Sequence, residues 1–60
     1  MDILDAVIER ISEQYTNASE DLVSGRVESY ADYKYVCGVL HGLLKVKREI
    51  EELKRNIEEY

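Results

Sequence analysis

The apolar residues of this chain fall into two blocks with helical spacing. In the first block they are separated by alternating steps of four and three residues, as in a heptad repeat: Leu4, Ile8, Ile11, Tyr15, Ala18 and Leu22, widened by Ile3 and Val7. The same spacing runs through the second block at Val36, Val39, Leu43, Val46, Ile50, Leu53, Ile57 and Tyr60. Each block predicts an amphipathic helix with one apolar seam.

Turn and cap residues separate the two blocks. Gly25 follows the first block and suits the left-handed position at a helix end, while Ser29 and Asp32 form a variant of the capping box. These signals predict a single all-α domain over residues 1–60, with a helix over 2–23, a turn over 24–28 and a helix over 29–60. Because the connection is short, the helices should pack as an antiparallel hairpin with a long second helix. Its last two turns, with Leu53, Ile57 and Tyr60, should then extend past the first helix.

A chain of 60 residues is short for a stable isolated fold. Such a chain buries only about 60% of the surface that its unfolded form exposes. Its one cysteine, Cys37, excludes an internal disulfide. We therefore expect self-association into a four-helix bundle or a coiled-coil-like oligomer.

Two glycines interrupt the middle of the second predicted helix. Each of Gly38 and Gly42 costs roughly 1 kcal/mol of helix propensity relative to alanine, and close approach of another backbone would offset that cost. The spacing predicts a close helix crossing there, inside the hairpin or between subunits. A docking groove for a different protein is the alternative.

Further apolar and aromatic residues accompany the main seam of the second helix and predict an interface. Tyrosine combines a large apolar ring with a polar hydroxyl, which suits interfaces. The predicted interface comprises Tyr30, Tyr33, Tyr35, Cys37, Leu40, Leu44, Leu53, Ile57 and Tyr60.

Charge is unevenly distributed along the chain. The net charge is −5, with −6 over residues 1–32 and +1 over residues 33–60. An acidic first half repels phosphates and disfavours a nucleic-acid partner; Lys45, Lys47 and Arg48 do not outweigh the net charge of −5. The expected partners are a second copy of the chain and another protein. No apolar run is long enough to cross a membrane, and the acidic N-terminus does not resemble a signal peptide.

Candidate catalytic or metal-binding groups are sparse. Cys37 and His41 lie four residues apart, so two copies could supply four zinc ligands, but a lone cysteine and a lone histidine on such a face are typical of ordinary packing. There is no third group to orient a cysteine–histidine pair, and no phosphate-binding glycine loop. We expect no enzyme activity, no metal and no cofactor.

The tract "DYKYVCGVLHGLLKVKREIEEL" and the preceding "LVSGRVESYADY" resemble small uncharacterised helical proteins of tailed bacteriophages, over about residues 20–53. That resemblance implies a phage origin and brings no catalytic residues. The size and shape also resemble the helical hairpin of plasmid copy-number control, which dimerises into a four-helix bundle and binds RNA.

These observations favour a phage-type protein-binding or assembly module, as a minor structural component of the virion. An acidic inhibitor or adaptor of a host or phage enzyme is the first alternative, and a nucleic-acid-associated regulator is the second. The expected location is the host cytoplasm or the virion.

Overall fold

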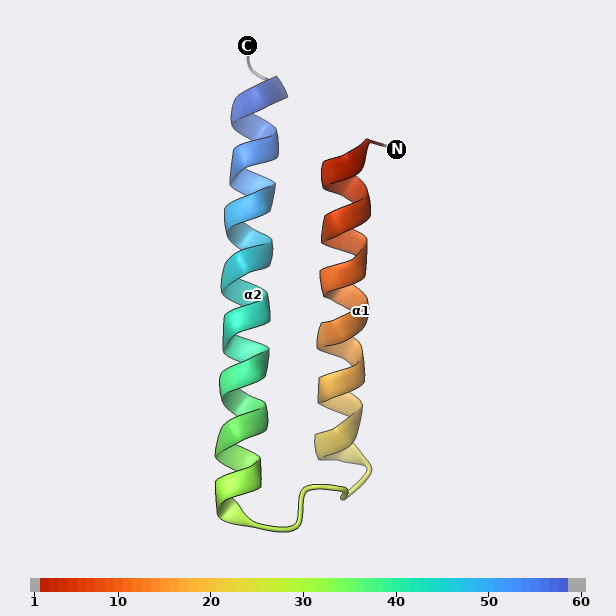
Figure 1. Cartoon of the computed structure of the whole chain (residues 1–60), viewed down its shortest axis with the longest axis vertical. Helices are drawn as coiled ribbons and strands as arrows, with labels where there is room; N and C mark the ends of the chain where they lie inside the picture. The colour runs from red at the N-terminus through yellow and green to blue at the C-terminus, as the bar shows by residue number, and fades with distance from the viewer. Residues whose placement is uncertain (1, 59–60) are drawn as a thin grey trace.

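The computed structural model describes residues 2–58 and consists of two antiparallel helices joined by a short connection (Figure 1). Helix α1 spans Ile3–Val23 and helix α2 spans Tyr30–Glu58. The described part of the chain is therefore an all-helical hairpin, as the sequence predicted. The start of α1 and the end of α2 lie at the end of the hairpin away from the connection, where α2 extends past the start of α1 (Figure 1).

Local signals define both ends of α1. The Asp2 carboxylate caps the first turn by accepting a hydrogen bond of 2.8 Å from the Asp5 backbone N–H. At the other end Gly25 adopts a φ of 80°, which only glycine tolerates easily. The Gly25 N–H then donates to the Leu22 carbonyl and the Arg26 N–H to the Asp21 carbonyl. This pair of bonds is a Schellman motif, and it satisfies carbonyls that the end of the helix would leave unpaired.

The hydroxyl of Ser29 caps α2. Its Oγ accepts a hydrogen bond of 3.1 Å from the Asp32 backbone N–H. The Tyr33 N–H donates to the Ser29 carbonyl and closes the first turn. The capping role predicted for Ser29 is confirmed, and the predicted helix end at Tyr60 lies outside the described residues.

The α2 residues that pack toward α1 repeat as a heptad, but three of them lie one position later than the sequence predicted. On α1 the predicted seam is at least half-covered along its length. On α2 the partly covered residues include Val36, Leu40, Leu43, Lys47, Ile50 and Lys54, which are separated by alternating steps of four and three. Val46 lies beside this covered seam and is 50% exposed, so its predicted place on the face toward α1 was wrong. Leu53 and Ile57, which were expected to extend past the first helix, are 52% and 55% exposed.

A two-helix layer has no interior. Within residues 2–58 no side chain, apolar or polar, is fully buried, and the Cα positions extend over 48 × 18 × 12 Å. Neither helix is long and apolar enough to cross a membrane. Each seam residue is covered on one side only, so the fold leaves broad apolar surface in contact with solvent.

Candidate protein-interaction surface

Large apolar side chains are exposed along most of the hairpin. Among the described residues they are Ile3, Val7, Tyr15, Val23, Tyr30, Tyr33, Tyr35, Val46, Leu53 and Ile57, with exposures from 37% for Tyr15 to 89% for Val23. Exposed apolar side chains mark interaction sites when they gather into a large patch. These side chains are therefore the candidates for an interaction surface.

The three tyrosines at the start of α2 do not form one cluster. The rings of Tyr30 and Tyr33 lie together, with centroids 6.3 Å apart and planes tilted by 32°. The neighbouring Cys37 side chain raises the pKa of the Tyr33 hydroxyl, so Tyr33 remains neutral and able to donate a hydrogen bond. Tyr35 lies 200° around the helix from Tyr33 by the 100° step per residue, and it is 73% exposed. Tyr30 and Tyr33 therefore lie on a different face of α2 from Tyr35.

The remaining predicted interface residues divide by exposure. Cys37, Leu40 and Leu44 are partly covered on the Tyr33 flank of α2, and the Cys37 thiol is free. Leu53 and Ile57 are about half exposed on the Tyr35 flank. Tyr60 lies outside the described residues.

Gly38 and Gly42 face open space in the hairpin. A Cβ atom built on either glycine would meet no atom within 4 Å. The predicted close crossing between α1 and α2 at these glycines is therefore wrong, because they lie on the part of α2 turned away from α1. A close crossing with another chain stays a prediction. The missing side chain of Gly42 leaves a shallow depression beside His41, Lys45 and Glu49.

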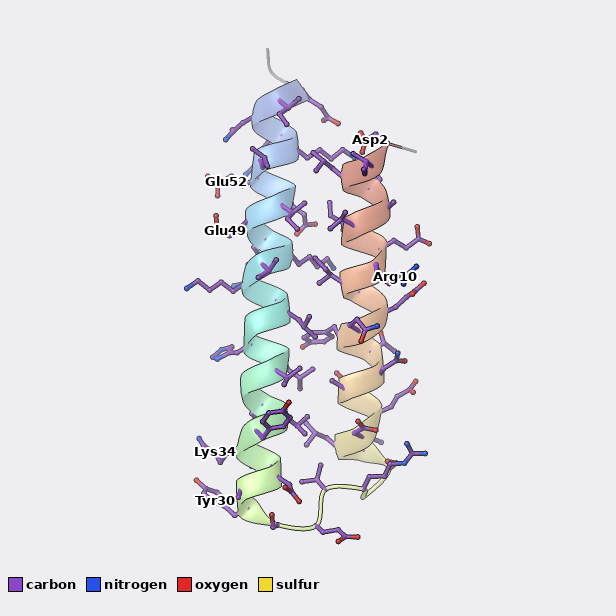
Figure 2. All side chains as sticks on the ribbon, in the orientation of Figure 1. Asp2, Arg10, Tyr30, Lys34, Glu49 and Glu52 are labelled. Carbon is purple, nitrogen blue, oxygen red and sulfur yellow. The ribbon has the colours of Figure 1, made fainter. Side chains whose placement is uncertain are left out.

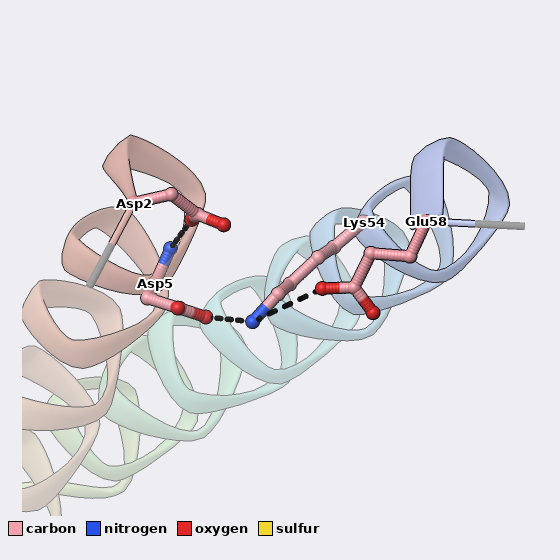
Figure 3. Close-up of polar contacts among 4 residues, drawn as sticks. All are labelled: Asp2, Asp5, Lys54 and Glu58. Carbon is pink, nitrogen blue, oxygen red and sulfur yellow. Dashed lines mark hydrogen bonds and ion pairs between the residues drawn. The ribbon is translucent and has the colours of Figure 1, made fainter. Parts of the chain in front are cut away.

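One ion-pair cluster ties the open ends of the two helices (Figure 3). The Lys54 ammonium of α2 donates to the Asp5 carboxylate of α1 and lies 3.7 Å from a Glu58 carboxylate oxygen. The hydrogen bond from Lys54 lowers the pKa of Asp5, and the same bond raises the pKa of Lys54. With side chains 25% and 33% exposed, Lys54 and Asp5 are a partly shielded pair.

The outward surfaces of the two helices carry different charge. On α1 the exposed carboxylates of Glu9, Glu13 and Glu20 share the side opposite the seam, with Arg10 paired to Glu13 at 3.7 Å. On α2, Lys34, Glu49 and Glu52 extend away from α1, as Figure 2 shows. The outer side of α1 is therefore acidic, whereas that of α2 has mixed charge.

No group of three or more His, Cys, Asp and Glu side chains that could hold a metal ion occurs within residues 2–58. Cys37 and His41 lie on the same flank of α2, one helical turn apart. A single copy thus offers at most two ligands at this place.

The sequence did not indicate three features of the surface. It placed Val46 in the seam and Ile3 beside it, yet both are exposed, and it gave no sign of the Lys54–Asp5 pair. A heptad line through Leu40, Lys47 and Lys54, one position after the predicted one, would have placed both lysines on the contact face and Val46 outside it. The pair itself depends on the register between the helices, for which the sequence has no local signal.

Comparisons of the chain with protein-family models, with curated proteins and with solved structures found no match. A function therefore has to be inferred from the surface of the hairpin itself.

Proposed function

We propose that this chain is a protein-binding assembly module that acts as a homo-oligomer. One observation carries the proposal: no side chain within residues 2–58 is fully buried, while large apolar side chains line the hairpin in contact with water. Each Å² of apolar surface that a partner removes from water stabilises the assembly by roughly 25 cal/mol, and a lone hairpin gains little of this energy. Pairing of hairpins into a bundle is the simplest way to cover these side chains.

Sedimentation equilibrium over a micromolar concentration series tests self-association. We expect a mass above that of one 7.0 kDa chain, together with a melting temperature that rises with protein concentration. A well-folded monomer with a concentration-independent melting temperature would contradict the proposal.

The assembly role that we favour is that of a minor structural component of a phage particle. Its support is the resemblance of residues 20–53 to small phage proteins, together with apolar faces suited to a position between other subunits. Mass spectrometry of purified particles should find the chain at a fixed copy number. If the chain is abundant in the infected cell but absent from purified particles, this role is excluded. That result would not affect the proposed self-association.

An inhibitor or adaptor of a host or phage enzyme is the second candidate function. It is favoured by the acidic outer side of α1, where Glu9, Glu13 and Glu20 are exposed and could meet a basic protein. The mixed charge of α2, with Glu49 and Glu52 beside Lys45 and Arg48, gives less support to a nucleic-acid-associated regulator.

The acidic surface can be tested without disturbing the contact between the helices. We would replace Glu9, Glu13 and Glu20 by glutamine and compare capture of basic proteins with a control carrying Glu49→Gln and Glu52→Gln. The inhibitor or adaptor hypothesis predicts salt-sensitive capture that only the α1 variant loses. Equal capture by both variants would contradict it.

A further inference from the structure

We draw no further inference here: the strongest candidate, the surface patch that the exposed side chains of Val46, Leu53 and Ile57 form along one flank of α2, carries nothing, because nothing in the structure shows what covers it.

Discussion

The Lys54 ammonium of α2 donates a hydrogen bond to the Asp5 carboxylate of α1, 49 positions away in the sequence. Within residues 2–58 it is the one polar side-chain contact that joins the two helices. Asp5 lies in the first turn of α1, where the positive end of the helix dipole also favours its negative charge. The open end of the hairpin is thus held by charge, whereas the other end is held by the connection.

The Lys54–Asp5 pair makes stability depend on acid pH. Since Lys54 lowers the pKa of Asp5 below its ordinary value of 3.8, the stabilisation is complete above pH 3.8. It is lost as the pH falls through the lowered pKa of folded Asp5. We expect Asp5→Asn to remove this part of the acid sensitivity. The melting temperatures of the variant and of the unmodified chain should therefore differ at pH 6 and converge toward pH 2. A difference that stays the same across that range would show that the Lys54–Asp5 pair does not cause the acid sensitivity.

The same pair predicts a loss of stability at alkaline pH. Asp5 raises the pKa of Lys54 above its ordinary value of 10.5, so the contribution is complete below pH 10.5 and is lost as the pH rises through the raised pKa. Lys54→Met keeps an apolar side chain at this position but removes the charge, so the variant should not show this alkaline phase, meaning the loss of stability as the pH rises. Lys34→Met, on the outer side of α2, is the control that should leave the phase in place.

Gly25 and Gly38 should respond in opposite directions to alanine. Gly25→Ala forces a Cβ into the left-handed region at a φ of 80°, and we expect a loss of about 1–2 kcal/mol in the free energy of unfolding. Gly38→Ala adds a Cβ that meets nothing within 4 Å and improves helix propensity, so it should gain up to about 1 kcal/mol. Urea denaturation of the two variants measures both changes. A loss of stability in Gly38→Ala would show that another chain approaches this position.

The Ser29 hydroxyl should contribute more to the free energy of unfolding than the serine hydroxyls within the helices. Ser29→Ala removes the acceptor for the Asp32 N–H and should cost about 1 kcal/mol. Ser19→Ala is the matched control, because its hydroxyl only donates back to the Tyr15 carbonyl within α1 and alanine is the better helix former. Equal losses in the two variants would show that the Ser29 hydroxyl does not act as a cap.

The ends of the helices could be predicted because their causes are local. Gly25 and Ser29 set the turn through their own backbone and hydroxyl geometry, and the structure places α1 and α2 within a residue or two of the expected bounds where they are described. The faces of α2 were less predictable. Val46 and Lys47 are neighbours, and a heptad seam through either of them also contains Val36, Leu43 and Ile50. Which flank of these three residues turns toward α1 depends on how the two helices pack, so the sequence pattern alone could not place Val46 or Lys54.

Covered and exposed leucines of α2 should respond differently to substitution. Leu43 is half-covered by α1, so Leu43→Ala should destabilise the hairpin itself by about 1 kcal/mol, about half the value of a fully buried leucine, at every protein concentration. Leu53 is 52% exposed, so Leu53→Gln should leave the melting temperature of dilute protein almost unchanged. At high concentration the same substitution should lower the melting temperature, because it places a polar group among the apolar side chains that the proposed self-association would cover. Thermal melts of both variants across a concentration series measure the two effects separately. If Leu53→Gln melts like the unmodified chain at all concentrations, Leu53 is not covered by a second copy, and the partner of this side chain must be sought elsewhere.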